Sequence, residues 1–138
     1  MKHTTYENVM YQEECYQIQG AIYDVNGEMG SGFLEAVYQE CLERELSRRQ
    51  IPFESQKELE LFYKGEPLTQ KYIPDLICYG KIIVELKAIR EIRPEHQAQL
   101  LNYLKAASME LGLLVNFGAY PKTEIIRMAN TQGSLGSR

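Results

Sequence analysis

The sequence lacks the cysteine and hydrophobic patterns that mark several protein classes. Its three cysteines, Cys15, Cys41 and Cys78, are widely spaced and form no CxxC pair. Such a set predicts neither a zinc site nor a disulfide framework and is typical of reduced thiols. The N-terminus is polar without a signal-peptide core, and no run of about 18 apolar residues could span a membrane. We therefore expect a cytoplasmic protein that does not cross a membrane.

The chain also lacks an excess of positive charge. Fifteen lysines and arginines stand against 19 acidic residues, which gives a formal net charge of −4. This balance counts against a high-affinity nucleic-acid clamp, because such proteins usually present a basic face. A bound divalent cation would weaken that objection, since it can be the largest positive charge near a substrate. The length of 138 residues fits one soluble domain, expected over 1–130, with a disordered Gly/Ser-rich tail at 131–138.

The spacing of apolar residues predicts the element order α-α-β-β-β-α-β-β. Helices are expected over about 9–25 and 33–49, strands over 59–63, 72–78 and 81–88, a helix over 95–110, and strands over 113–117 and 123–128. The strand at 81–88 is apolar on both faces, which is typical of a strand in the middle of a sheet. This order favours an α/β sandwich over a doubly wound sheet.

Two carboxylates fall at the open end of the hairpin expected over 72–88. A tight turn at 79–80 pairs Asp75 with Val84, one position before Glu85. Pro74 cannot donate a ladder hydrogen bond, so a bulge or a strand end is expected beside it. Such a distortion would bring Asp75 and Glu85 to a common site.

A lysine completes this group. Glu85 and Lys87 are two residues apart on one strand, so their side chains share a face. Carboxylate oxygens at the end of an apolar hairpin suit Mg²⁺ or Mn²⁺. The residues alone also allow a surface salt bridge between Glu85 and Lys87, with Asp75 in a turn. Burying charge in an apolar strand is costly without a partner, which favours the metal site.

Two helices carry further polar residues that could join it. Gln99 and Tyr103 are four residues apart, so they lie on one face of their helix, although such a pair is also typical of a helix shoulder. Glu35 lies at the edge of the apolar stripe of the second helix, from which a carboxylate can face the sheet. A solvated glutamate favoured by the helix dipole is the alternative for Glu35.

Taken together, these motifs resemble the GxxExxY family, which belongs to the PD-(D/E)XK nuclease-like superfamily. The segment 32–38 (GFLEAVY) matches the motif that names the family, and Pro74-Asp75 with Glu85-Leu86-Lys87 matches the two halves of the superfamily signature. The segment 99–103 (QLLNY) is similar to the QxxxY helix of the exonuclease-type branch, and the strand 112–117 also resembles the family. The likeness covers about residues 18–128.

The resemblance implies a restriction-endonuclease-like core, in which helices flank a mixed central sheet. It also implies a Mg²⁺- or Mn²⁺-dependent deoxyribonuclease that hydrolyses phosphodiester bonds. Asp75, Glu85 and Glu35 would then form the acidic metal-binding cluster, and Lys87 would orient or help to deprotonate the attacking water. Gln99 and Tyr103 would position the scissile backbone or support the acidic residues.

Substrate contacts and partners are less sharply defined by the sequence. Arg90, Arg93 and His96 lie where phosphate contacts would be useful, but solvated-loop roles are equally compatible with their positions. A non-catalytic nucleic-acid-binding or accessory protein of a defence or repair complex is the alternative function. The intact lysine favours the enzyme, whereas the acidic charge favours the alternative. A homodimer or an accessory protein partner is compatible with either, and RNA is not distinguished from DNA.

Overall fold

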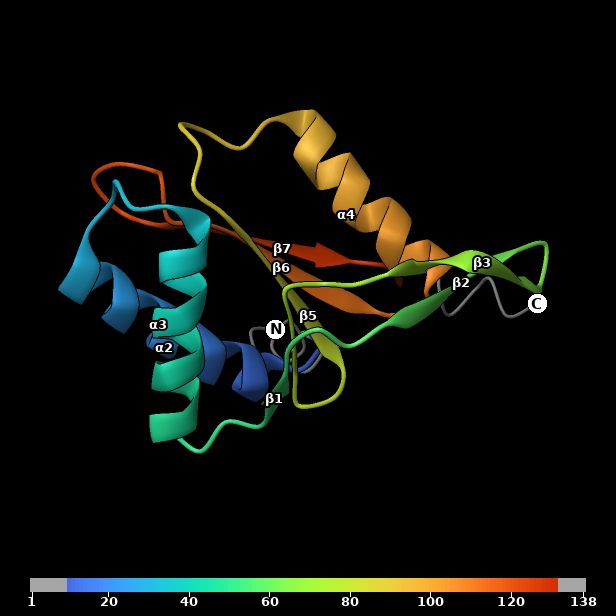
Figure 1. Ribbon diagram of the computed structural model, residues 1–138, viewed down its shortest axis with the longest axis horizontal. Helices are drawn as coiled ribbons and strands as arrows, with labels where there is room; N and C mark the ends of the chain where they lie inside the picture. Colours follow the sequence, from blue (N-terminus) through green and yellow to red (C-terminus); the bar gives the residue numbers. More distant parts are fainter. Residues whose placement is uncertain (1–9, 132–138) are drawn as a thin grey trace, which may run out of the picture.

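The computed structural model combines helices and strands in an α/β arrangement (Figure 1). The structure describes residues 10–131, and none of the helices in that range is long and apolar enough to cross a membrane. In chain order, the elements are α2 (Gln12–Met29), α3 (Glu35–Arg48), β1 (Phe53–Glu54), β2 (Leu59–Tyr63), β3 (Glu66–Tyr72), β4 (Leu76–Cys78), β5 (Ile82–Lys87), α4 (Pro94–Ala106), β6 (Leu111–Asn116) and β7 (Glu124–Ala129).

The central sheet is mixed, with strand order β1-β4-β5-β6-β7. Only β5 and β6 run parallel, and α4 connects them; the other neighbours are antiparallel. A parallel pair needs a crossover connection, usually a helix, and α4 supplies it. The expected mixed central sheet flanked by helices is therefore confirmed.

Helices cover both faces of this sheet (Figure 1). On one face, α2 and α3 pack on a core that includes Ile18, Leu42 and Val84. On the other face, α4 and the β2–β3 hairpin pack on a second core that includes Ile83 and Leu104. Strands β5 and β6 lie between the two cores, which explains why both are apolar on their two faces.

Alternation along β5 decides which face receives the charged residues. Ile82, Val84 and Leu86 belong to the core under α2 and α3, whereas Ile83 packs under α4. Successive side chains of a strand point to opposite faces, so Glu85 and Lys87 follow Ile83 onto the α4 side. The charged residues of β5 therefore lie on this face alone, at the C-terminal end of the strand.

The segment between the second helix and β5 differs from the expectation. The single strand expected over 72–78 is two strands, because β3 ends at Tyr72 and β4 begins at Leu76. The expected strand end beside Pro74 is confirmed. Within residues 10–131, strand β3 pairs only with β2, through a turn at 64–65, and lies outside the central sheet. The short strand β1 is also additional, since two residues are too few to show a periodic pattern.

Three helix boundaries also differ. Helix α2 continues to Met29, past Gly27, and helix α3 begins at Glu35 rather than at residue 33. Helix α4 ends at Ala106, not at residue 110, and the following strand begins at Leu111 rather than at 113, so Gly112 lies inside β6. A side chain at Gly112 would crowd Leu100, so this glycine serves the packing of α4 on the sheet. Residues 132–138 of the expected tail lie outside the described residues.

Candidate active site

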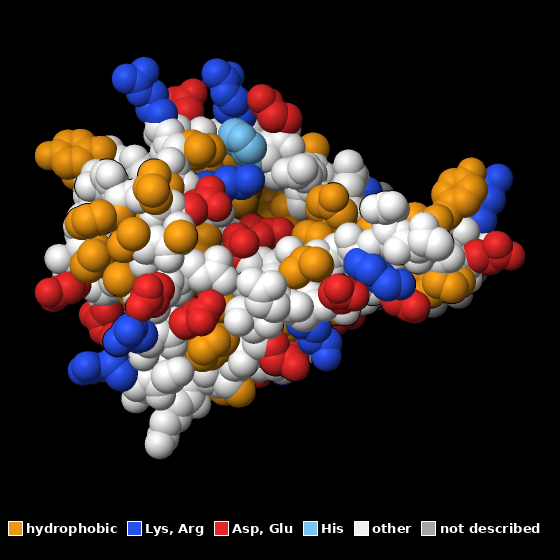
Figure 2. Space-filling model, viewed as in Figure 1, with side chains coloured by type: hydrophobic (Ala, Val, Ile, Leu, Met, Phe, Trp, Pro, Cys, Tyr) orange, Lys and Arg blue, Asp and Glu red, His pale blue; other side chains and the backbone are white. Residues whose placement is uncertain are grey.

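A polar pocket opens on the α4 side of the sheet, where Figure 2 shows acidic side chains around a hollow with a basic side chain beside them. The pocket has a volume of about 200 Å³. We call it the carboxylate pocket, and its lining consists of Glu35, Asp75, Glu85, Leu86, Lys87, His96, Gln99, Leu100, Tyr103 and Leu114. Residues from two helices and three strands or strand ends therefore meet at one place.

The register of the β4–β5 hairpin brings the two carboxylates together. Leu76 pairs with Val84 and Cys78 with Ile82, so the turn holds three residues and the expected pairing of Asp75 with Val84 is wrong by one position. Tyr79 and Gly80 both have positive φ angles, of 57° and 71°, which accommodates the longer turn. One step beyond the last pair, Asp75 lies opposite Glu85, and opposite residues in an antiparallel pair point to the same face.

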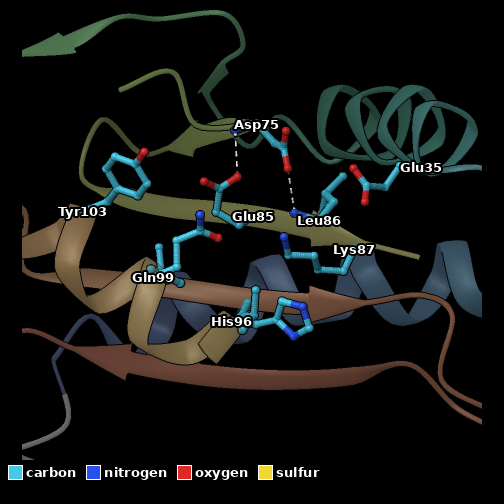
Figure 3. A pocket seen from close by; sticks show the side chains of 10 residues that line it. Glu35, Asp75, Glu85, Leu86, Lys87, His96, Gln99 and Tyr103 are labelled. Carbon is cyan, nitrogen blue, oxygen red and sulfur yellow. Dashed lines mark hydrogen bonds between the residues drawn. The ribbon is translucent and has the colours of Figure 1, made fainter. Parts of the chain in front are cut away.

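Side chains replace the ladder hydrogen bonds at this end of the hairpin (Figure 3). The Leu86 N–H donates to Oδ2 of Asp75 at 2.7 Å, and the Asp75 N–H donates to Oε1 of Glu85 at 3.2 Å. Pro74 interrupts the strand just before, which leaves these amides free for side-chain acceptors. Each carboxylate is therefore fixed by the backbone of the opposite strand segment.

Burial makes the charge on Glu85 costly. Desolvation, with a contribution from the nearby Asp75 carboxylate, raises the pKa of Glu85 to about 7 against the opposing effect of the hydrogen bond from Tyr72. The Tyr72 hydroxyl donates to Oε2 of Glu85, and burial raises the pKa of Tyr72, so this phenol stays a donor. A cation bound here would stabilise the buried Glu85 carboxylate, whose pKa is raised.

Lys87 extends into the same space from the end of β5 (Figure 3). Among residues 10–131, no ion pair includes Lys87, so the surface salt bridge with Glu85 is not formed. Its ammonium group is therefore available to a ligand of the pocket. This arrangement agrees with the expectation that Glu85 and Lys87 share one face.

Glu35 faces the pocket from the first turn of α3, and the residues around it explain the spacing of its motif. Gly32 has a φ of 117°, a conformation that L side chains rarely adopt. Tyr38 is 0% exposed and stacks on Phe117, with ring centroids 4.5 Å apart. Its hydroxyl donates to the Gly30 carbonyl at 2.5 Å and accepts from the Phe33 N–H at 3.2 Å. Tyr38 and Gly32 therefore determine the conformation of the loop that precedes Glu35.

The apolar stripe expected on this helix needs one correction. The helical spacing of apolar residues places Leu34 on this stripe, but Leu34 is 79% exposed, because it precedes the helix and has an extended backbone. The buried positions of α3 are Tyr38, Leu42 and Leu46. Glu35 nevertheless lines the pocket, since it begins the helix at the end nearest Leu86 (Figure 3).

Helix α4 contributes Gln99 and Tyr103 on one face, as their spacing predicts. The Tyr103 ring stacks on Tyr72, with centroids 4.1 Å apart. The Gln99 amide points toward Glu85 (Figure 3). Tyr103 therefore supports Glu85 through Tyr72, and Gln99 approaches it directly.

The three residues expected near phosphate are separated by the structure. His96 lines the pocket, and its Nδ1 accepts the Arg93 N–H at 2.9 Å, which caps the start of α4. Arg90 and Arg93 lie exposed in the loop between β5 and α4, outside the pocket lining. The pocket thus gathers the histidine and leaves both arginines on the surface next to it.

Three residues that support the site were missed from the sequence. Tyr72 belongs to a hairpin outside the central sheet, so no local pattern connects it with Glu85. Gln39 donates to the backbone carbonyl of Asp75 at 3.0 Å from an otherwise ordinary helix position. Asn116 could have been found, because it is a polar residue at the end of a wholly apolar strand. It is 0% exposed and bonds to both the N–H and the carbonyl of Ile89, at 3.0 Å each.

The donor set of the pocket fits a divalent cation in part. Asp75 and Glu85 supply carboxylate oxygens, which Mg²⁺ and Mn²⁺ prefer, and Mg²⁺ usually binds through one or two carboxylates while keeping several waters. Within residues 10–131, however, no three His, Cys, Asp or Glu side chains are grouped closely enough to hold an ion. Glu35 therefore lies on the wall of the pocket without completing a three-carboxylate cluster.

Comparisons with known proteins agree with this architecture. The chain matches the family model of the PD-(D/E)XK nuclease superfamily over residues 12–128. It is also similar to the crystal structure of SSO0001, with a TM-score of 0.52 and 24% identity, over 69% of this chain and 50% of that one. This likeness concerns the fold, and the chain spans about half the length of that protein. No curated protein matches the chain. The chain belongs to the PD-(D/E)XK nuclease superfamily.

Proposed function

We propose that this protein is a Mg²⁺- or Mn²⁺-dependent nuclease that hydrolyses phosphodiester bonds in DNA. The observation that carries the proposal is the pair of opposed carboxylates, beside a Lys87 ammonium that forms no ion pair among residues 10–131: Asp75 accepts the Leu86 N–H and Glu85 accepts the Asp75 N–H. The choice of DNA as the substrate rests on the superfamily, so the test also includes RNA.

Asp75 and Glu85 are the proposed cation ligands. Both have an oxygen fixed by a backbone N–H and carry negative charge that no described lysine or arginine neutralises in an ion pair. A bound divalent ion would neutralise charge on the phosphate and lower the pKa of a water molecule. Mg²⁺ and Mn²⁺ are the ions of choice because oxygen donors suit them best. Glu35, farther along the wall, would act through water.

Lys87 and Glu35 are proposed to orient the attacking water, and Lys87 to stabilise the charge of the phosphate. The Lys87 ammonium can donate to the attacking water or to a non-bridging phosphate oxygen, because its three donors have no acidic partner. Stabilising charge that develops in the transition state is usually the largest single contribution to catalysis. The Glu35 carboxylate faces the same space and would accept a hydrogen bond from that water.

Helix α4 is proposed to position the substrate. Gln99 can donate to a phosphate oxygen from the floor of the pocket, and Tyr103 holds the Tyr72 ring that bonds to Glu85. His96 lines the pocket with its Nε2 edge still available, because Nδ1 is used within the helix cap. Arg90 and Arg93 would contact phosphates farther along the strand, outside the pocket.

The decisive experiment is a cleavage assay with single-stranded, double-stranded and branched DNA, and with matched RNA, in Mg²⁺ or Mn²⁺. We expect cleavage of at least one DNA substrate that stops on chelation and is lost in Asp75→Asn. Glu58→Gln is the matched control, because this exposed carboxylate lies outside the pocket. If purified protein leaves every DNA substrate intact in both metals, or if Asp75→Asn cleaves as fast as the parent, the proposal fails.

A non-catalytic role is the second candidate, and the separation of Glu35 from the other two carboxylates favours it. A binding or accessory protein would retain nucleic acid in a mobility-shift assay without cleaving it. In that case Lys87→Ala would weaken binding as much as the loss of any surface lysine, because only charge would matter. Hydrolysis by the parent would exclude this candidate.

A further inference from the structure

A second cavity lies beside the carboxylate pocket, between α4 and the β2–β3 hairpin. It has a volume of about 450 Å³. We call it the helix–hairpin cavity, and its lining consists of Leu61, Leu68, Glu95, Ala98, Gln99, Asn102, Tyr103 and Ala106. Its surface is mostly apolar, in contrast to the carboxylate pocket, and Figure 2 shows hydrophobic side chains between the hollow and the projecting hairpin. Cavities of this size hold small organic groups.

The two cavities adjoin each other and share part of their lining. Gln99 and Tyr103 line both of them, so a ligand that reaches the carboxylates lies next to the helix–hairpin cavity. Tyr103 is held by its stack on Tyr72, and Tyr72 is anchored by its hydrogen bond to Glu85. The shared wall is therefore rigid and connected to the proposed metal ligands.

The chemistry of the lining selects one kind of group. Leu61, Leu68 and the Tyr103 ring form apolar surface against which a flat ring can pack. Asn102 and Gln99 present amide groups that can donate to and accept from the edge of a heterocycle. Glu95 at the mouth adds an acceptor and no positive charge, so the cavity does not suit a phosphate. A planar ring with polar edges, attached to a phosphodiester, is a nucleobase.

We propose that the helix–hairpin cavity receives one unpaired nucleobase of the strand whose phosphodiester lies in the carboxylate pocket. The proposal rests on the proposed function, and it adds a base-binding subsite to the phosphate site. Helix α4 forms one wall and the hairpin forms the other, so a paired base with its partner strand does not fit between them. The subsite therefore requires an unpaired or flipped nucleotide at this position and does not accept a base within an intact duplex.

Ala98 offers a way to fill the cavity without touching the carboxylates. It is exposed on α4 and lines only the helix–hairpin cavity. Ala98→Phe places a ring where the base would pack, and Leu68→Trp narrows the same space from the hairpin as a second variant. Gln12→Phe is the matched control, because it adds the same ring at an exposed, uncharged helix position outside both linings.

The test combines these variants with an altered substrate. Dissociation constants are measured by fluorescence anisotropy, with Ca²⁺ as the cation, for a labelled single-stranded DNA oligonucleotide. Matched oligonucleotides each carry one abasic nucleotide, placed in turn at the positions that flank the bond cleaved in Mg²⁺ or Mn²⁺. We expect Ala98→Phe to weaken binding of intact DNA about tenfold, in line with the contribution of one stacked base. At one abasic position, the parent should bind the abasic DNA about tenfold more weakly than intact DNA. Ala98→Phe should not weaken binding of that abasic DNA any further.

Each outcome has a distinct meaning. Non-additive losses at one position support the base subsite, because two changes that remove one contact do not add. If Ala98→Phe and Leu68→Trp bind intact and abasic DNA as the parent does, or if Gln12→Phe weakens binding as much as Ala98→Phe, the inference is overturned while the nuclease proposal stands. If the parent neither binds nor cleaves nucleic acid, the proposed function fails, and the subsite fails with it.

Discussion

At the scale of single residues, the buried charge of Glu85 destabilises the fold, and the same charge would bind a cation. Its carboxylate is buried beside Asp75 and accepts hydrogen bonds from Tyr72 and from the Asp75 backbone. Burial outweighs these bonds, and the pKa of Glu85 rises to about 7. A neutral side chain of the same shape should therefore suit the metal-free fold better than the native one.

Glu85→Gln should stabilise the metal-free protein at alkaline pH. Because the pKa of Glu85 is raised in the folded state, its contribution is fully present below the unfolded value and is lost as the pH rises through about 7. Glutamine does not titrate, so its gain should be on the order of 2 kcal/mol at about pH 8 and should shrink toward zero near about pH 5. Urea unfolding at both pH values, with chelator present, measures this. A variant less stable than the parent at the higher pH would contradict it.

Lys87→Ala should separate catalysis from metal binding. The ammonium has no ion-pair partner among the described residues, so its removal leaves no buried charge behind. We expect the rate of cleavage to fall by about 100-fold or more, as for the loss of one group that stabilises the transition state. Mn²⁺ affinity should hold or increase. Lys105→Ala, an exposed lysine of α4, serves as the control. Equal rates for the two variants would remove Lys87 from the mechanism.

At the scale of elements, short polar anchors position the ends of α3 and β5. Tyr38 ties the loop before α3 through its hydroxyl, and Asn116 ties the loop after β5 through the backbone of Ile89. Both anchors lie at the pocket end of the sheet. They hold Glu35 and Lys87, which no secondary structure alone would fix, since each lies in the first or last position of its element.

Tyr38→Phe should loosen the loop without disturbing the aromatic packing. The ring keeps its stack on Phe117 but loses hydrogen bonds to Gly30 and Phe33, at a cost of about 1 to 2 kcal/mol. Because Glu35 follows this loop, cleavage should slow while calorimetric Mn²⁺ affinity stays the same. Tyr16→Phe, on the exposed side of α2, is the matched control. A variant with unchanged kcat would show that the loop does not position Glu35.

Gly118 and Gly27 provide a matched pair for the loop after β5. A Cβ at Gly118 would lie 2.2 Å from the Ile89 carbonyl oxygen, whereas at Gly27 it would meet nothing within 4 Å. Gly118→Ala should therefore destabilise the protein by about 1 to 3 kcal/mol or more and displace the loop beside Lys87. Gly27→Ala, inside a helix, should stabilise it by about 1 kcal/mol. Thermal unfolding of both variants checks the opposite signs, and a neutral Gly118→Ala would show that the loop can move freely.

Element type was predictable from local patterns, whereas the positions that depend on distant contacts were not. The apolar run of β5 and the shared face of Glu85 and Lys87 follow from alternation alone. The pairing of Asp75 was misjudged by one residue, because the turn type depends on backbone angles at Tyr79 that no pattern encodes. No local pattern indicates the role of Tyr72, because its contact with Glu85 joins residues of two different sheets.

At the scale of the whole molecule, the site lies where the central sheet, both helical layers and the separate hairpin meet. The fold places the acidic pair at the end of the sheet and opens an apolar cavity next to it. With a net charge of −4, the chain has no general attraction for a polyanion. Local charge must therefore recruit the substrate, and a divalent cation on Asp75 and Glu85 would provide it.

The most direct measurement is isothermal titration calorimetry with Mn²⁺ at about pH 8, where Glu85 is ionised. We expect Mn²⁺ to bind to the parent, the binding to be lost in Asp75→Asn and in Glu85→Gln, and the affinity to decrease less in Glu35→Gln. The exposed control Glu58→Gln should bind as the parent does. Absence of binding to the parent, or equal binding to the parent and Asp75→Asn, would contradict the proposed metal site.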